Sequence, residues 1–440
     1  MSLPAVSLLV CGTVMTMDDH RSLIENGAVA VAGNTICEIG TRDRLVGKYP
    51  EARILEVGRG LVMPGLVNVH THAAMALLRG LADDLPLMTW LQDHIFPVES
   101  KLSAELVYQG TLLSAMEMIK GGTTSFCDMY LFAKDVARAA EKSGLRAWVG
   151  EVLYDFPSPN YGPLAQGLIY VDEMFARYEN HPRVTVTVDP HAVYTCAPDL
   201  LVRLKEKALD RGSRYVIHLS ETEGEVRNAR AQFGKSPVHH LEALGLLDSS
   251  VIAAHCVAIT SEEIALLAER GVKIGHCPES NMKLASGVAP LGAMRAARLD
   301  IGLGTDGAAS NNDVDMFAEM DMAAKLQKVT NLDPTALPAA QVLEMATRGG
   351  ARVLAAEQLI GSLEVGKRAD MIVIDLDKPH LTPLYDIPAH LVYAVRATDV
   401  VHSVIDGRIV MENRQLLTLD EEAVLAHCRQ LAAQLTGRTC

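Results

Sequence analysis

The stretch LVMPGLVNVH, residues 61–70, is the first of eight short apolar runs that decide the fold. Longer segments with the apolar spacing of helices separate these runs. The seven later runs are residues 123–127, 146–151, 184–189, 215–219, 251–255, 272–276 and 301–305. Eight strands that alternate with helices are typical of a parallel sheet closed into a barrel. The sequence therefore predicts an α/β fold, a TIM (β/α)8 barrel, over residues 61–360.

One helix between these runs carries clear signals at both ends. Thr260 and Glu263 match a capping box, in which each side chain bonds the backbone of the other residue. Ile264 and Leu267 belong to an apolar stripe, and Gly271 stands where such a helix would end. We expect a helix between these residues and a strand directly after it.

The two ends of the chain show short strands and turns instead of helix–strand units. Gly33-Asn34 marks a hairpin in the first segment. The last segment has a similar texture and closes with a helical tail after Asp420. We predict that residues 1–60 and 361–440 combine into a small composite β-sandwich domain beside the barrel.

The composition is that of a globular protein, with 49% hydrophobic and 21% charged residues in a chain of 440. Its 40 Lys and Arg against 54 Asp and Glu give a formal net charge of −14. This balance argues against nucleic acid as the main partner, because phosphate recognition needs a basic surface. The eight cysteines form no Cys-x-x-Cys pair, which excludes thiolate zinc ribbons and thioredoxin-like redox chemistry.

Hydropathy gives no sign of a membrane segment, since no run of about 18 apolar residues occurs. The apolar stretch Leu3–Met17 imitates the core of a signal peptide. No Lys or Arg precedes it, however, and Asp18-Asp19 closes it without a cleavage pattern. We interpret this stretch as a strand pair and expect a cytoplasmic protein.

The C-terminal ends of the strands, where barrel active sites lie, are rich in metal-ligand residue types. His70 ends the first run and His72 follows two residues later, so both imidazoles point to the same side of a strand. The fifth and sixth runs supply His218 and His255, and Asp306 directly follows the eighth. Histidines with a carboxylate suit zinc, and also iron or manganese, with room for a water.

Glu221 follows His218 by three residues, which places it just past the barrel rim, near the predicted metal.

Two other motifs resemble known binding signatures but do not fit them. GLGTDG, residues 302–307, has the spacing of a dinucleotide fingerprint, but Asp306 would repel a pyrophosphate and no further βαβ unit follows. HLE, residues 240–242, matches half of the cytidine-deaminase zinc signature, whose Pro-Cys-x-x-Cys half is absent.

Several segments resemble the amidohydrolase superfamily, in its branch of deaminases and chlorohydrolases. They are PGLVNVHTH, HLSET, AHC, HCPESNMKLASG and GTDGAASNN. Within that branch, RGLADDLPLMTWLQDHIFPVE (79–99) and DPHAVYTC (189–196) are similar to the 5′-methylthioadenosine/S-adenosylhomocysteine deaminases. The resemblance covers essentially the whole chain.

The resemblance implies one zinc ion per chain, with ligands His70, His72, His218 and Asp306. It also implies that His255 hydrogen-bonds the hydroxide at the metal. Binuclear relatives carry a carboxylated lysine at the end of strand 4. Here that run ends in Val188-Asp189 with His191 beyond it, so a second metal is not expected.

The chemistry implied is hydrolytic deamination of a 6-aminopurine nucleoside. Zinc lowers the pKa of a bound water to about 7, which makes hydroxide available at neutral pH. Asp306 can take a proton from that water, and Glu221 can protonate a ring nitrogen of the purine. Hydroxide then attacks the carbon that bears the amine, ammonia leaves, and a 6-oxopurine remains.

Other residues are expected to select the substrate. By resemblance, Glu99 accepts hydrogen bonds from the ribose hydroxyls and His191 contacts the base. Met88 and Trp90 are candidates for an apolar slot around a thioether, although packing is the commoner role of such residues. Some relatives use arginines after strand 3, whereas VLYDFPSPNYGPLAQ (152–166) has none, so a homocysteine carboxylate lacks an evident cationic partner.

We therefore expect 5′-methylthioadenosine as the main substrate, converted to 5′-methylthioinosine and ammonia, with S-adenosylhomocysteine and adenosine as further substrates. One alternative is an amidohydrolase acting on guanine, an oxidised purine or a triazine. Glu99 separates the two, because a substrate without ribose does not need it. A non-catalytic scaffold is a remote alternative, since such drift should first erode the ligand set. The resemblance also implies a homodimer or larger homo-oligomer.

Overall fold

The structure of the chain, a computed structural model, describes residues 5–437. Each of the eight expected runs contains a strand, and these strands pair in parallel. They form sheets of order β5-β6-β7-β8, with β9 on β7, and β10-β11-β12-β13. The strands are β5 (Leu66–Thr71), β6 (Thr123–Tyr130), β7 (Arg146–Leu153), β8 (Val184–Val186), β9 (Asp189–Pro190), β10 (Tyr215–Leu219), β11 (Val251–His255), β12 (Lys273–His276) and β13 (Asp300–Leu303).

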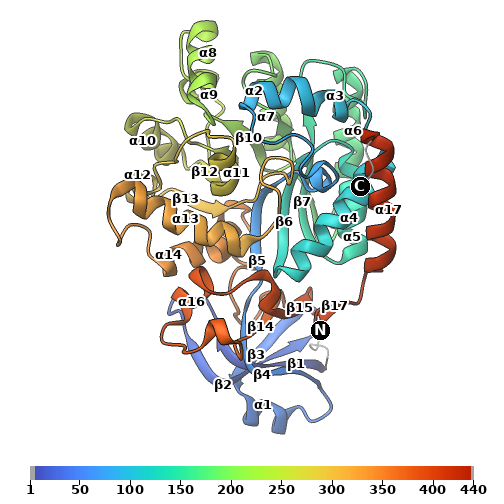
Figure 1. Cartoon of the computed structure of the whole chain (residues 1–440), viewed down its shortest axis with the longest axis vertical. Helices are drawn as coiled ribbons and strands as arrows, with labels where there is room; N and C mark the ends of the chain where they lie inside the picture. The colour runs from blue at the N-terminus through green and yellow to red at the C-terminus, as the bar shows by residue number, and fades with distance from the viewer. Residues whose placement is uncertain (1–4, 438–440) are drawn as a thin grey trace.

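Isolated parallel bridges join these sheets into a ring. Val188 with Tyr215 and Ala192 with His218 close one side, and Thr71 with Asp306 closes the other. The result is the curled parallel sheet of a TIM-like barrel, with helices around it (Figure 1). These helices are α4 (Ala104–Lys120), α5 (Ala133–Ser143), α6 (Leu164–Arg177), α7 (Pro198–Asp210), α8 (Glu223–Phe233), α9 (Pro237–Ala243), α10 (Ser261–Arg270), α11 (Pro278–Lys283), α12 (Leu291–Ala296), α13 (Met316–Asn331), α14 (Ala339–Glu344) and α15 (Gly350–Val353).

The end signals of α10 act as the sequence predicts. Thr260 and Glu263 form the capping box, each side chain accepting a hydrogen bond from the other residue's backbone. The helix ends before Gly271, whose φ of 72° is the left-handed conformation that glycine adopts without strain. β12 begins at Lys273, so this helix and strand follow each other as expected.

The two chain ends build one mixed sheet at one end of the molecule (Figure 1). Its order is β17-β16-β15-β14-β4-β1-β2-β3, so strands from both ends lie side by side. The strands that the structure describes in the two chain ends belong to this single sheet, and the expected two-layer sandwich is not confirmed. The strands are β1 (Val6–Met15), β2 (Leu23–Ala32), β3 (Thr35–Thr41), β4 (Arg53–Pro64), β14 (Met371–Asp375), β15 (Val400–Ile405), β16 (Arg408–Glu412) and β17 (Gln415–Leu416). The described parts of the same two chain segments also contain the α-helices α1 (Arg42–Lys48), α16 (Ile387–Tyr393) and α17 (Glu421–Thr436), the last being the expected tail.

The prediction of a strand pair over Leu3–Met17 is wrong for the part of that stretch which the structure describes. There the chain forms the single strand β1. Residues on both sides of Gly12 pair with the same two neighbours, β2 and β4, across a register shift. The irregularity is therefore a bulge within one strand and not a turn between two. Leu3 and Pro4 lie outside the described residues.

A buried ion-pair cluster joins the composite sheet to the barrel. Arg146, the first residue of β7, donates from Nε to Asp370 at 2.7 Å and from Nη2 to Asp406 at 3.2 Å. Because Arg146 marks the N-terminal end of a barrel strand, the composite sheet covers that end of the barrel. The opposite end, where the strands finish, is left for a functional site.

Two further observations refer to residues 5–437, the part of the chain that the structure describes. None of their helices combines the length and the hydropathy that crossing a membrane requires. The cysteines described are all free, namely Cys11, Cys37, Cys127, Cys196, Cys256, Cys277 and Cys428.

Candidate active site

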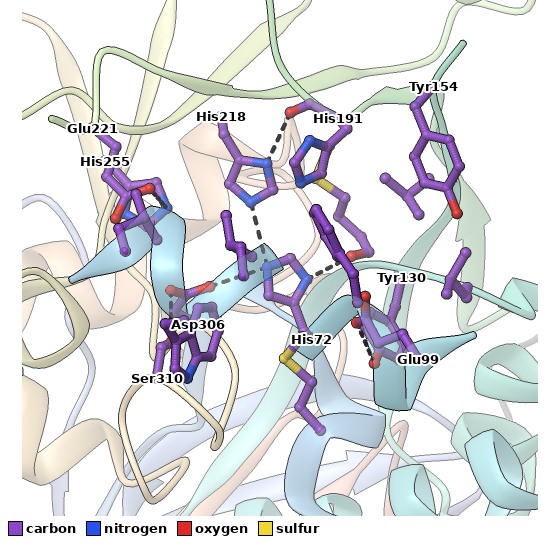
Figure 2. Close-up of a pocket in the computed structure, with 18 of the residues that line it drawn as sticks. His72, Glu99, Tyr130, Tyr154, His191, His218, Glu221, His255, Asp306 and Ser310 are labelled. Atoms are coloured by element: carbon purple, nitrogen blue, oxygen red, sulfur yellow. Dashed lines mark hydrogen bonds and ion pairs between the residues drawn. The ribbon is translucent and has the colours of Figure 1, made fainter. Parts of the chain in front are cut away.

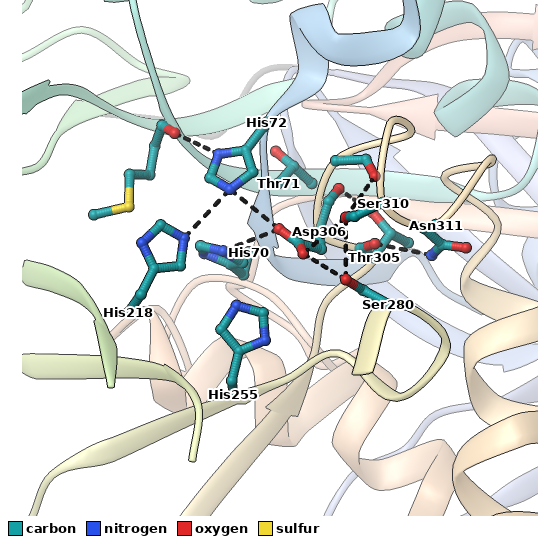
Figure 3. Close-up of polar contacts among 12 residues, drawn as sticks. His70, Thr71, His72, His218, His255, Ser280, Thr305, Asp306, Ser310 and Asn311 are labelled. Carbon is teal, nitrogen blue, oxygen red and sulfur yellow. Dashed lines mark hydrogen bonds and ion pairs between the residues drawn. The ribbon is translucent and has the colours of Figure 1, made fainter. Parts of the chain in front are cut away.

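Four side chains meet at the C-terminal end of the barrel strands, with ligand atoms within 4.8 Å of one another (Figure 3). They are His70 and His72 at the end of β5, His218 of β10, and Asp306 after β13. Alternation along β5 turns both imidazoles to one side, while Thr71 between them points away and donates to Asp128 at 2.8 Å. The structure thus brings together the four residues that the sequence predicts as metal ligands.

His72 and His218 turn their Nε2 atoms toward a shared centre. Nδ1 of His72 lies 2.6 Å from the carbonyl oxygen of Met129, and Nδ1 of His218 lies 2.8 Å from that of His191. A carbonyl only accepts, so each Nδ1 carries a proton, and in the neutral ring that binds a metal Nε2 offers the lone pair. Nε2 of His72 lies 3.3 Å from Nε2 of His218 and 3.1 Å from Oδ1 of Asp306.

The remaining polar atoms of the group fit a metal ion. In the described part of the chain, Nε2 of His70 and Oδ1 of Asp306 are buried, lie 3.4 Å apart and make no hydrogen bond. Buried polar atoms normally have a partner, and a cation at the shared centre would supply it. Three imidazole nitrogens and one carboxylate oxygen form a donor set that zinc accepts with a position left open.

The other oxygen of Asp306 is held by two hydroxyl groups. Ser280 donates to Oδ2 at 2.7 Å and Ser310 at 3.0 Å (Figure 3). Burial raises the pKa of the Asp306 carboxyl, but its contacts with His70 and His72 outweigh burial and hold that pKa well below the usual value. Asp306 is therefore ionised, with one oxygen anchored and the other facing the histidines.

Glu221 and His255 lie together beside this group (Figure 2). Glu221 follows β10, and its Oε2 is 4.0 Å from Nε2 of His255. Its Oε1 accepts a hydrogen bond from Ser286 at 2.9 Å. Burial raises the pKa of the Glu221 carboxyl above its usual value. A carboxyl with a raised pKa holds its proton to higher pH, as a general acid requires.

These side chains border one cavity, whose empty space together with the open solvent at its mouth is about 720 Å³ (Figure 2). His70 is fully buried and is not one of its lining residues. The other residues that the sequence predicts for the site all line it, namely His72, Glu99, His191, His218, Glu221, His255 and Asp306. The metal ligands and the residues expected to contact substrate thus share one chamber.

Glu99 and His191 are each held by a hydroxyl group. Glu99 ends α3 (Phe96–Glu99), and its Oε1 accepts from the phenol of Tyr130 at 2.7 Å. Burial raises the pKa of the Glu99 carboxyl. Nδ1 of His191 lies 2.9 Å from Oγ1 of Thr195, so Nε2 is the ring nitrogen left for a ligand.

Part of the cavity wall is aromatic, and sequence reasoning missed most of it. Tyr154 and Phe156 stack with ring centroids 3.9 Å apart, and the ring of Phe96 lies 6.4 Å from that of Phe156. Trp90 also lines the cavity, whereas Met88 is exposed and does not. Among the described lining residues there is no Lys or Arg. Tyr154 directly follows β7, so reading the strand ends would have found it.

A sequence profile described as "Amidohydrolase family" matches residues 61–410. A 5-methylthioadenosine/S-adenosylhomocysteine deaminase of Syntrophobacter fumaroxidans is 52% identical over 425 residues, which cover 97% of each chain. A 5′-deoxyadenosine deaminase of Methanosarcina acetivorans is 44% identical, again over 97% of each chain.

Among solved structures, an adenosine deaminase from Xanthomonas campestris with bound zinc is similar, with a TM-score of 0.96 and 39% sequence identity. The likeness covers 99% of this chain and 100% of that one. The profile spans the barrel and its metal-ligand group, and the relatives match over nearly their full length. The chain therefore belongs to the amidohydrolase family.

Proposed function

We propose that the protein is a zinc-dependent aminohydrolase that deaminates a 6-aminopurine nucleoside. The observation that carries this proposal is the placement of two carboxyl groups in one cavity with the metal-ligand group. Glu221 and Glu99 lie on opposite sides of the rings of His72 and His218 (Figure 2). A nucleoside fits this arrangement at both ends. Its base has a ring nitrogen that Glu221 can protonate, and its ribose has hydroxyl groups that Glu99 can accept hydrogen bonds from. The relatives named for adenine nucleosides support the same substrate class.

The metal would be held by His70, His72, His218 and Asp306. Bound in such a site, zinc supplies a water-derived nucleophile at neutral pH, because it lowers the pKa of water to about 7. Asp306 accepts the proton that the attacking water loses. Glu221 donates its proton to the ring nitrogen beside the carbon that bears the amine, which makes that carbon electrophilic. Asp306 then passes the proton it accepted to the amine, which leaves as ammonia. The Glu221 carboxylate takes back a proton from the new hydroxyl group, so that a 6-oxopurine remains.

We assign substrate orientation to Glu99 and His191. The bond from Tyr130 occupies Oε1 of Glu99, so Oε2 is available to accept from ribose hydroxyls. Nε2 of His191 is available to the base, since its Nδ1 is engaged by Thr195. His255, with Nε2 4.0 Å from Glu221, is placed to hydrogen-bond the attacking oxygen.

The aromatic wall favours a small uncharged 5′ group. Tyr154, Phe156 and Trp90 supply apolar contacts, and the described lining offers no Lys or Arg for a carboxylate. Burying an unpaired carboxylate is costly, so the homocysteine end of S-adenosylhomocysteine is disfavoured. We therefore propose 5′-methylthioadenosine as the preferred substrate, with 5′-methylthioinosine as product, and S-adenosylhomocysteine and adenosine as weaker substrates.

Ammonia release tests the proposal. The panel is 5′-methylthioadenosine, S-adenosylhomocysteine, adenosine, guanine and cytosine, with zinc-loaded protein and a chelated control. We expect metal-dependent turnover of the nucleosides, led by methylthioadenosine. Turnover of guanine but of none of the nucleosides would mean that the site acts on a different heterocycle. Inactivity on the whole panel with zinc bound would refute the proposal.

We also propose that each chain binds one divalent ion. Zinc is the preferred ion, and iron(II) and manganese(II) are the alternatives. The proposal includes a cytoplasmic homodimer or larger homo-oligomer and domain boundaries at residues 60/61 and 360/361. Metal analysis of purified protein, light scattering and limited proteolysis measure the ion content, the assembly and the boundaries in turn.

A further inference from the structure

One short stretch, Pro278–Ser286, contacts the two carboxyl groups to which the proposed function gives proton transfer, and also the histidine that it places beside the attacking oxygen. It consists of α11 and the turn that follows. The side chain of Ser280 reaches Asp306 at 2.7 Å and also Ser310 at 3.0 Å. Asn281 reaches His255 and Ser286 reaches Glu221, each at 2.9 Å. The stretch lies within the segment HCPESNMKLASG, to which the proposed function gives no role.

The two serines treat their carboxylates in the same way. Ser280 binds Oδ2 of Asp306 and leaves Oδ1 toward the histidines, 3.1 Å from Nε2 of His72. Ser286 binds Oε1 of Glu221 and leaves Oε2 on the side of His255. In each case one oxygen is anchored and the other is left for chemistry. Such anchoring holds a carboxylate in a single rotamer.

Asn281 decides which nitrogen of His255 carries the proton. Its carboxamide oxygen lies 2.9 Å from Nδ1 of His255 and can only accept, so Nδ1 is the protonated nitrogen. In the neutral ring, Nε2 of His255, which lies on the side of Glu221, then has the lone pair and acts as an acceptor. The opposite tautomer would leave Nδ1 facing an oxygen without a proton between them.

The stretch is braced independently of these three contacts. The amide of Ser286 donates to the carbonyl of Asn281 at 2.9 Å, which closes the turn onto the helix. The amide of Glu279 donates to Oε2 of Glu319 on α13 at 3.2 Å, and Nζ of Lys283 donates to Asp83 at 2.6 Å. A braced backbone lets side chains that lie behind the cavity wall hold those inside it.

We propose that Pro278–Ser286 is a positioning segment for proton transfer. Asn281 sets the tautomer of His255, and Ser286 sets the orientation of Glu221, without either touching the substrate. Ser280 does the same for Asp306. The inference rests on the proposed function and adds the residues through which its acid, its base and its histidine are aligned.

Kinetics of Asn281→Ala and Ser286→Ala test the segment. We expect kcat to fall about 10- to 100-fold in each, as for other residues that orient a catalytic group, with KM changed by less than about threefold and zinc content unchanged. Asn281→Asp and Ser286→Thr keep the acceptor and the hydroxyl, so we expect partial recovery. Met282→Ala, an exposed position on the same helix, is the matched control and should match the parent protein.

Nitrogen NMR of histidine-labelled protein gives a readout that loose packing would not reproduce. We expect His255 as the Nδ1–H tautomer in the parent protein and in Asn281→Asp, and a loss of that preference in Asn281→Ala. A His255→Gln sample assigns the signal. Should Asn281→Ala fail to fold, Ser286→Ala decides, because Ser286 is half-buried and lies outside α11, whereas Asn281 is buried within it.

Full kcat in both alanine variants, or an unchanged tautomer in Asn281→Ala, would overturn the positioning segment. Failure of the proposed function looks different. In that case the parent protein is inactive on every nucleoside, while the tautomer experiment still decides the role of Asn281.

Discussion

The phenol of Tyr130 donates a hydrogen bond to Oε1 of Glu99 across 2.7 Å and thereby joins the end of β6 to the end of α3. Both residues line the cavity, so the bond lies at its wall. It leaves Oε2 of Glu99 as the oxygen that meets a ligand. Because the carboxylate is held before binding, little conformational entropy is lost when hydroxyl groups dock on it.

Glu99→Gln should weaken nucleoside binding more than chemistry. A hydrogen bond to a charged acceptor contributes about 1.5–3 kcal/mol, which corresponds to a fall in kcat/KM of about 10- to 100-fold, mostly through KM. Steady-state assays with methylthioadenosine and its 2′-deoxy analogue measure the effect. The variant should discriminate less between the two than the parent protein does. Equal discrimination in both proteins would remove ribose recognition from Glu99.

Glu221→Gln should keep the metal and lose turnover. The amide preserves the shape of the side chain but cannot protonate a ring nitrogen, and a positioned acid contributes about 10²- to 10⁴-fold to the rate. Zinc content by mass spectrometry and kcat are measured on the same preparation. Retained activity in a metal-replete sample would defeat the role given to Glu221.

Removal of the metal should lower thermal stability. An ion present at about 1,000 times its Kd adds about 4 kcal/mol to the free energy of unfolding, provided that it binds the native state alone. We expect a chelator to lower the midpoint of thermal unfolding and added zinc to restore it. His218→Ala, which deletes one ligand, should respond much less to either treatment. An identical response of that variant would place the stabilising ion elsewhere.

Glu151 should make stability depend on pH away from the metal ligands. Burial raises the pKa of this carboxyl from its ordinary 4.5 to about 8, although it accepts hydrogen bonds from Ala133 and Asn160. Between these pH values the native chain holds a proton that the unfolded chain has released. The free energy of unfolding therefore falls as pH rises from about 4.5 to about 8.

Glu151→Gln removes that contribution, so its midpoint of thermal unfolding should fall less than that of the parent protein between pH 5 and pH 8. Metal-loaded protein is used throughout, and the difference between the two chains isolates Glu151. Glu269→Gln, whose side chain is 69% exposed, serves as the control and should follow the parent protein. A parallel loss in Glu151→Gln would mean that this carboxyl ionises normally in the native state.

Much of the fold and the metal-ligand group could be predicted from the sequence, because both depend on the spacing of residues that are near neighbours in the chain. Eight apolar runs with helical patterns between them already specify strands in a parallel barrel. The period of two along a strand puts His70 and His72 on one side, and the end of a strand puts Asp306 at the same rim. Caps such as Thr260 with Glu263 depend on neighbours three residues apart.

What the sequence by itself determined is therefore the order of the strands, their ends and the residue types that those ends carry. Tertiary structure decided which of these residues touch. Tyr130 and Glu99 are 31 positions apart, and Ser286 and Glu221 are 65 apart, so no local pattern links them. The sequence also indicated that the two chain ends combine, but only the tertiary structure decided that their strands form one mixed sheet. Such contacts arise from how whole helices and loops pack, and that packing depends on the shape of the entire core and not on the spacing of near neighbours.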